Sequence, residues 1–407
     1  MNLVRLPIGM FLLITAMCGI QFPTRYDRVE NTLVRPLAFV YDNHTLAEGS
    51  PGDTITLHSY YAGERVSSID WTIAMQVLSS DFGVNIFGDP ISLSTYTVPG
   101  SYHEYFGGTT DSATLDFVIP ADIIRKQFAS SATVMSLLPA QTVSLIPPSI
   151  ASEPVQILVD ALDDIASKIP NQIADLPYDP AYQWLTTTLQ NGGLGIAGLE
   201  PLLQIFSINI KIFALVNGKY NVESTYTVRY NDKFHFLDSR IPVNHNPVIN
   251  WIEVCRLKKG ASSSSFDPIA DADKIDTTFR LDIANDTVPI DEGYHYFLVC
   301  DSAVASLDSG YSLTSSNVQR ENLLCDWLFR DEDQVPGIPL DSLVALGSGR
   351  SNAVELLPPV DTRMQHFSLW LVGYDRFRGE RLRPVGFTFL FRHGVFRFSE
   401  AYKNAHQ

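Results

Sequence analysis

Several motifs that carry enzymatic or metal chemistry are missing from this 407-residue chain. It has only four cysteines, and they form neither a CxxC pair nor a histidine–cysteine spacing suited to zinc. The nine histidines are scattered without an HExxH pair, and no G-x-S-x-G motif occurs. These absences argue against a zinc hydrolase and a serine hydrolase of the elbow type. We therefore expect a non-catalytic protein with no cofactor.

Basic residues are also few. Lys and Arg number 29 against 45 Asp and Glu, which gives a formal charge of −16 at pH 7. Such a chain repels phosphate backbones and anionic lipid headgroups. The densest basic group, four arginines between 376 and 383, is interleaved with Asp375 and Glu380. We expect no nucleic acid partner.

Long hydrophobic runs are lacking, and the run near the start is short. One basic residue, Arg5, precedes an apolar stretch from Leu6 to Ala16. About eleven apolar residues are too few to cross ~30 Å of hydrocarbon comfortably as a permanent helix. This layout is typical of an export signal over residues 1–18, and it places the rest of the chain outside the cytoplasm.

Cys18 follows Thr15, Ala16 and Met17 and resembles the lipidation cysteine of bacterial lipoproteins. The resemblance implies a diacylglyceryl group on the Cys18 thiol, a membrane anchor through the N-terminal lipid, and a location in the bacterial cell envelope, at the outer membrane or cell surface. Ordinary cleavage near Cys18 or Gly19 and an uncleaved stretch are the alternatives. The short polar segment 19–35 is predicted to be a tether.

From Pro36 onward apolar and polar residues alternate with a period of two, and turn signals punctuate the runs. This pattern predicts a first antiparallel β-sandwich over residues 36–235. Within it, about 121–204 shows helical spacing and predicts a helical insertion, with a separate small helical domain as the alternative. Asn217-Gly218 lies between two apolar-patterned runs and predicts a hairpin.

A second strand series begins at the NxNP turn of residues 244–247 and predicts a second β-sandwich over 242–400, followed by a C-terminal tail at 401–407. The turn, Trp327, the acidic turn 331–333, ELLPP at 355–359 and SLWLVGYDRFRG at 368–379 resemble immunoglobulin-like and PKD-like extracellular modules. The resemblance covers about 245–400. The expected fold is thus mainly β, with two immunoglobulin-like sandwiches in tandem.

Possible sites are few. Asp331, Glu332, Asp333 and Asp375 are weak candidates for Ca²⁺ ligands, although a solvated acidic turn is the simpler interpretation. Cys255, Cys300 and Cys325 lie in apolar runs and are expected to be buried thiols with at most one disulfide. Several tyrosines could stack on sugar rings or fill the core instead.

These observations predict a membrane-anchored lipoprotein that acts in surface recognition or scaffolding, with a protein or glycan partner on the cell surface. A secreted carbohydrate-binding or carbohydrate-active protein is the first alternative. A subunit of an extracellular envelope or filament assembly is the second, because edge strands of sandwiches can pair between chains.

Overall fold

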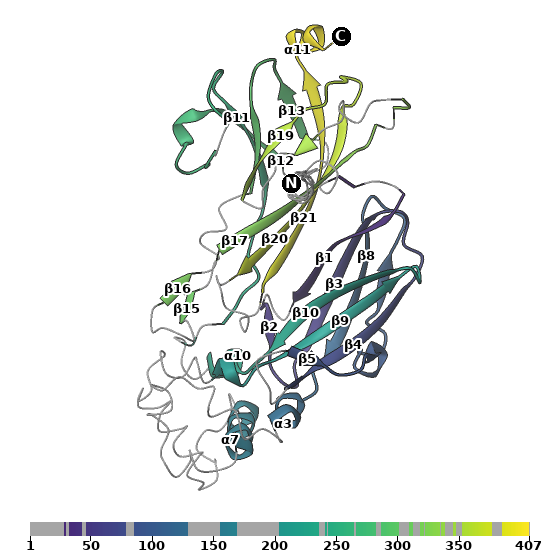
Figure 1. Cartoon of the computed structure of the whole chain (residues 1–407), viewed down its shortest axis with the longest axis vertical. Helices are drawn as coiled ribbons and strands as arrows, with labels where there is room; N and C mark the ends of the chain where they lie inside the picture. The colour runs from purple at the N-terminus through teal and green to yellow at the C-terminus, as the bar shows by residue number, and fades with distance from the viewer. Residues whose placement is uncertain are drawn as a thin grey trace, which may run out of the picture.

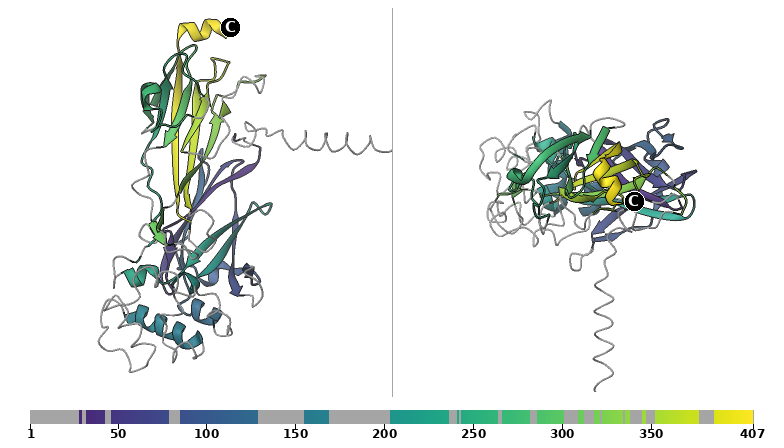
Figure 2. Two further views of the ribbon diagram at one scale, coloured as in Figure 1. Left: turned by 60° about the vertical axis from the view of Figure 1, so that its left-hand side comes forward. Right: turned by 90° about the horizontal axis from the view of Figure 1, so that it is seen from above.

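The computed structural model describes residues 28–29, 32–42, 46–78, 85–128, 155–168, 203–235, 241, 243–263, 266–281, 286–300, 309–311, 318–320, 322–333, 335–337, 345–346, 352–376 and 385–406. The export signal, Cys18 and the first part of the predicted tether therefore lie outside the described residues. The chain is mainly β, with several antiparallel sheets, as the sequence predicted. The molecule is elongated, with α3 and α7 near one end and α11 at the other (Figures 1 and 2).

Two sheets form the first sandwich. One has the order β1-β3-β8-β7, with strands at Val34–Asp42, Thr54–Gly63, Asp111–Val118 and His103–Tyr105. The other has the order β2-β10-β9-β4-β5, with β6 beside β4. Its strands span Glu48–Gly49, Tyr220–Val228, Ile208–Val216, Ile69–Leu78, Asn85–Phe87 and Ile91–Ser92. One buried cluster joins the inner faces of both sheets, with Leu57, Phe117, Ile210 and Val228 among its members.

The predicted hairpin is present. Asn217 and Gly218 both have positive φ, 52° and 63°, and they connect β9 to β10 in antiparallel register. Two central residues with positive φ are what a type I′ turn requires. The Asn217 side chain also accepts hydrogen bonds from the backbone N–H of Ser67, at 2.7 Å, and of Ser68, at 3.4 Å, which ties the turn to the chain leading into β4.

Two helices of the predicted insertion are described, α3 (Ile123–Phe128) and α7 (Val155–Lys168). Buried residues of both, including Phe128, Leu158 and Leu162, belong to the same cluster as the inner faces of the first sandwich. The apolar residues whose spacing predicted α7 form one face of the helix, and this face covers the end of the core. The described helices thus extend the core of the sandwich.

Two further sheets form the second sandwich, with the orders β12-β11-β14-β19-β18 and β13-β21-β20-β17. The first has strands at Ile275–Leu281, Ile252–Leu257, Tyr296–Cys300, Ala353–Leu357 and Ala345–Leu346, and the second at Asp286–Ile290, Phe387–Phe398, His366–Arg376 and Asn322–Asp331. A small sheet pairs β15 (Ser309–Tyr311) with β16 (Val318–Arg320). A second buried cluster contains Leu298, Trp327, Leu371 and Phe396.

Three details differ from the sequence prediction. Two edge pairs, β2 with β10 and β13 with β21, are parallel, whereas purely antiparallel sandwiches were expected. The predicted tether does not extend to residue 35, because β1 begins at Val34 and Val29 is already buried. The predicted tail is helix α11 (Glu400–Ala405), in which Ser399 caps the N-terminus and Tyr402 packs into the second core.

Candidate functional site

The two sandwiches meet through an apolar junction, which we define by a third buried cluster. Ala38 and Ala62 of the first sandwich lie in this cluster with Leu328, Trp370 and Val372 of the second. Partly buried aromatic residues flank them, and the ring of Tyr60 stacks on that of Phe389 with centroids 4.0 Å apart. In Figure 1, β20 and β21 run beside β1 at this point. The outer face of one sheet in each sandwich is thus removed from water.

Polar contacts fix the geometry of the same junction. The indole Nε1 of buried Trp370 donates a hydrogen bond to Thr110 Oγ1 at 2.8 Å. Asn246, in the predicted NxNP turn, donates to the carbonyl of Tyr41 at 2.7 Å and accepts from the N–H of Phe387 at 2.9 Å. One amide side chain therefore bonds to both sandwiches at once. Such directed bonds restrict the relative orientation far more than apolar burial alone.

The segment before β1 also belongs to the junction. The backbone N–H of Val29 donates to the carbonyl of Phe329 at 2.8 Å, and the Val29 side chain is part of the junction cluster. Arg28 forms an ion pair with Asp331 at 3.2 Å, and only 4% of the Asp331 side chain is exposed. The chain therefore contacts the second sandwich before it enters the first.

The acidic turn proposed as a weak Ca²⁺ site makes bonds within the protein. Glu332 accepts from the guanidinium of Arg330 at 2.9 Å and from the Ser368 hydroxyl. Asp333 accepts from the backbone N–H groups of Gln365 and His366, at 2.6 and 2.7 Å. Despite some desolvation, these bonds and the His366 ring lower the pKa of Asp333. The carboxylates act as caps and ion-pair partners where the end of β17 lies beside the start of β20.

Asp375 does not lie beside this turn. In the register of β17 and β20, Asp331 faces Phe367 whereas Asp375 faces Leu323, eight residues along the strand. Eight residues of strand correspond to about 27 Å. Asp375 is buried and accepts from the N–H of Gly386 at 2.7 Å, close to the NxNP turn. Among the described residues, no group of three or more His, Cys, Asp or Glu is placed to hold a metal ion.

A serine, a histidine and a carboxylate do meet near this turn. Ser368 Oγ lies 3.1 Å from His393 Nδ1 and donates to Glu332. In a catalytic triad the carboxylate orients the imidazole, and the imidazole contacts the nucleophile. Here the carboxylate contacts the hydroxyl instead, and Ser368 is fully buried. The arrangement bridges three neighbouring strands and lacks the order of a triad.

A buried charged cluster closes the helical end of the first sandwich. Arg229 pairs with Glu48, and both side chains are almost completely inaccessible. Burial raises the pKa of Glu48 to about 7, although Arg229 opposes the shift. Burial likewise raises the pKa of Asp232 to about 6; the hydrogen bond from Ser50 opposes this shift, and the charge of Asp53 adds to it. Lys233 donates to Asp53 at 2.6 Å. The cluster joins β2, β10 and α10 (Asn231–His235).

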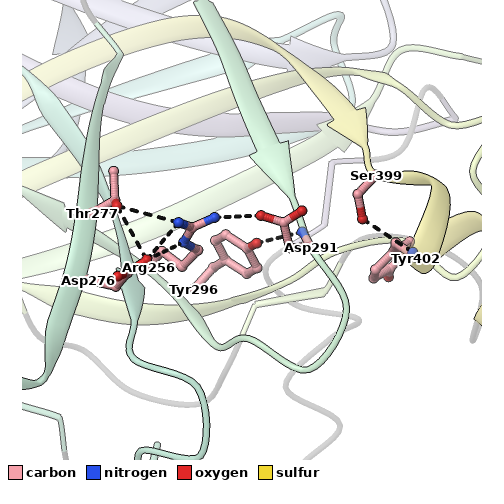
Figure 3. A network of polar contacts seen from close by, with 7 residues as sticks. All are labelled: Arg256, Asp276, Thr277, Asp291, Tyr296, Ser399 and Tyr402. Carbon is pink, nitrogen blue, oxygen red and sulfur yellow. Dashed lines mark hydrogen bonds and ion pairs between the residues drawn. The ribbon is translucent and has the colours of Figure 1, made fainter.

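Figure 3 shows a second polar network, at the α11 end of the other sandwich. Arg256 donates to Asp276 at 2.9 Å from Nε and 2.6 Å from Nη2, and it also pairs with Asp291. The Tyr296 hydroxyl accepts from the N–H of Asp291 at 2.7 Å. The guanidinium of Arg256 therefore already bonds to two carboxylates. The network connects β11 and β12 to the turn before β14, and it does not present an open anion site.

Most tyrosines considered for sugar stacking are not exposed. Tyr61 and Tyr296 are buried in the cores, and Tyr60 lies in the junction. Tyr96, Phe106 and Tyr294 pack partly against the cores. Two remain open to solvent: Tyr102, just before edge strand β7, at 38% exposure, and Tyr105, the last residue of β7, at 63%.

Comparisons with known proteins give no family. No family model matches the chain, and no curated protein matches it. Among solved structures, the crystal structure of a collagen adhesin from S. aureus is similar at 7% sequence identity and a TM-score of 0.10, over 90% of this chain and 97% of that one. A TM-score this low carries no argument. In the described part of the chain, no helix combines the length and apolar character needed to cross a membrane.

Proposed function

We propose that this chain is a non-catalytic, exported lipoprotein of the bacterial cell envelope, in which two immunoglobulin-like sandwiches form one rigid scaffold for surface recognition. The junction carries the proposal. Trp370, Asn246 and Arg28 each connect parts of the chain that lie far apart in sequence, and an apolar cluster lies between them. A rigid spacer needs this kind of interface, because domains joined by a linker alone move relative to each other.

The position of the first described residues supports an anchor at the junction rather than at an end of the molecule. Arg28 and Val29 are bonded to β17. Arg28 lies ten positions after Cys18, and ten positions of extended chain reach at most about 36 Å. A lipid on Cys18 would therefore hold the protein by its middle, and both ends would remain available for partners.

The test is membrane fractionation of cells that express the full chain or Cys18→Ser. The wild-type protein should sediment with membranes and need detergent for release, because diacylation plus an amide-linked acyl chain gives stable attachment. Cys18→Ser should be soluble. If Cys18→Ser also stays with membranes, or if the wild-type protein is soluble, the proposal of a lipid anchor on Cys18 is wrong.

Glycan binding is the second candidate. Tyr102 and Tyr105 are open to solvent on one edge, and exposed aromatic rings can stack on sugars. A glycan array with wild type and Tyr105→Ala tests this function. Binding that the variant loses would favour it over scaffolding. An extracellular assembly through edge strands such as β7 would instead appear as concentration-dependent mass in light scattering.

A further inference from the structure

Two cysteines face each other across the core of the second sandwich. Cys300 ends β14 in one sheet, and Cys325 lies in β17 of the facing sheet. Their Sγ atoms are 3.8 Å apart, and both side chains belong to the same buried cluster, at 4% and 0% exposure. Both thiols are free in the structure.

The third described cysteine is on the other side of the sheet. Cys255 neighbours Val254 on β11, and successive side chains of a strand point to opposite faces. Val254 belongs to the inner core, whereas Cys255 belongs to an outer cluster with Leu257, Phe297 and Val299. Its Sγ lies 3.8 Å from Thr278 Oγ1. The folded sheet thus separates Cys255 from the facing pair.

We propose that Cys300 and Cys325 form an inter-sheet disulfide in the exported protein, and that Cys255 remains a thiol. This inference rests on the proposed export, because disulfides persist in oxidising compartments. A disulfide has an S–S distance of about 2.05 Å, so the two sulfurs must approach each other by about 1.8 Å.

The oxidant is a donor disulfide, of a thiol oxidase or of oxidised glutathione. The thiolate of one cysteine attacks the donor, forms a mixed disulfide and releases one donor thiol. The second cysteine then attacks the mixed disulfide and releases the other donor thiol. The protein loses two electrons and two protons, and the donor gains them.

The order of events follows from burial. The adjacent Cys300 thiol, together with burial, raises the pKa of Cys325 above its ordinary range. Because the thiolate is the nucleophile, the closed core disfavours the reaction. The bond therefore forms while the second sandwich is folding, before the two sheets close.

The pairing is tested by refolding the full chain as Cys18→Ser, which removes the fourth thiol without changing a described residue. The reduced, denatured protein is refolded in a glutathione redox buffer, its free thiols are alkylated in denaturant, and its peptides are mapped by mass spectrometry. We expect a Cys300–Cys325 cross-link, an alkylated Cys255 and a melting temperature several degrees above that of the reduced form. Cys255→Ala, the matched control, should keep the cross-link.

Cys300→Ala and Cys325→Ala should each leave every remaining thiol free, and circular dichroism shows whether they fold. Cross-links to Cys255, or no cross-link, would overturn the pairing. The same map on protein from the cell envelope separates the two proposals. If the disulfide forms in the redox buffer but the cells contain only reduced protein, in the cytoplasm, then the proposed export is wrong and the proposed pairing stands. Envelope protein with three free thiols overturns the pairing alone.

Discussion

Trp370 Nε1 donates a 2.8 Å hydrogen bond to Thr110 Oγ1 across the junction of the two sandwiches, although 260 positions separate these residues in sequence. Trp370 is completely buried, and its ring stacks on that of Phe391 with centroids 5.5 Å apart. Arg330 lies over the same indole. The single N–H donor of the Trp370 indole, in the second sandwich, therefore has its acceptor in the first sandwich.

Thr110→Val should lower the free energy of unfolding by about 1–3 kcal/mol, because it leaves the buried indole N–H without its acceptor. Chemical denaturation followed by tryptophan fluorescence measures the loss. The neighbouring Thr109→Val is the matched control, since Thr109 takes no part in this bond, and it should change stability little. Equal losses for both variants would contradict the role given to the Trp370–Thr110 bond.

The Arg28–Asp331 ion pair is expected to couple the N-terminal segment to the second sandwich. A double-mutant cycle with Arg28→Ala and Asp331→Asn should give an interaction energy of about 0.5–3 kcal/mol, because the carboxylate is nearly inaccessible and is weakly screened by salt. The exposed pair Lys403–Glu400 serves as the comparison and should give under about 0.5 kcal/mol. If the effects of Arg28→Ala and Asp331→Asn on the free energy of unfolding are strictly additive, the two side chains do not interact and the ion pair does not couple Arg28 to the second sandwich.

Calcium should leave thermal stability unchanged. Glu332 and Asp333 already accept hydrogen bonds, and Asp375 lies about 27 Å along the strand from Asp331. A site that bound only the folded form would add about 2.7 kcal/mol at 100 times its dissociation constant. Melting curves with millimolar Ca²⁺ and with a chelator should coincide. A rise of several degrees that Asp331→Asn with Asp333→Asn abolishes would establish a calcium site.

Stability should fall as pH rises from about 4 to 6, through Asp232. Burial raises the pKa of Asp232 from 3.8 to about 6 in the folded state, so the folded protein keeps a proton that the unfolded chain releases. Proton binding favours the state with the higher pKa, and the free energy of unfolding then decreases across this range, by at most about 3 kcal/mol. Urea denaturation at pH 4.5 and 6.5 measures the slope.

Asp232→Asn should make this slope shallower, because the amide does not titrate. The slope that remains comes from Glu48, whose pKa burial raises to about 7. The exposed Asp70→Asn is the control and should leave the slope as in the wild type. If Asp232→Asn leaves the slope unchanged, proton uptake at this carboxyl is not linked to folding.

Much of the fold follows from local patterns. Period-two alternation predicted β3 and β8, and the Asn-Gly pair predicted the β9–β10 turn, because both signals depend on neighbouring residues alone. The parallel strand β13 was not predicted. Its partner β21 lies about 108 positions away, and DTVPI gives no local sign of a parallel edge pair. The C-terminal helix was missed although Ser399 and Glu400 are typical of a helix start.

The junction was the larger omission, yet the sequence held a sign of it. In SLWLV, both Trp370 and its neighbours Leu369 and Leu371 are apolar, so the strand is hydrophobic on both faces. A strand buried on one side only alternates, and two apolar faces indicate cover on both sides. Which surface provides that cover depends on contacts distant in sequence, such as Tyr60 with Phe389. Sequence spacing gives no access to those contacts.

Small-angle X-ray scattering tests the rigid two-sandwich scaffold most directly. The Cys18→Ser protein should give one profile that fits the elongated arrangement of Figure 1, unchanged between low and moderate salt, because the junction is mainly apolar. Tyr60→Ala combined with Thr110→Val should broaden the distance distribution while circular dichroism stays the same. A wild-type profile that already requires many relative orientations of the two sandwiches would contradict the scaffold.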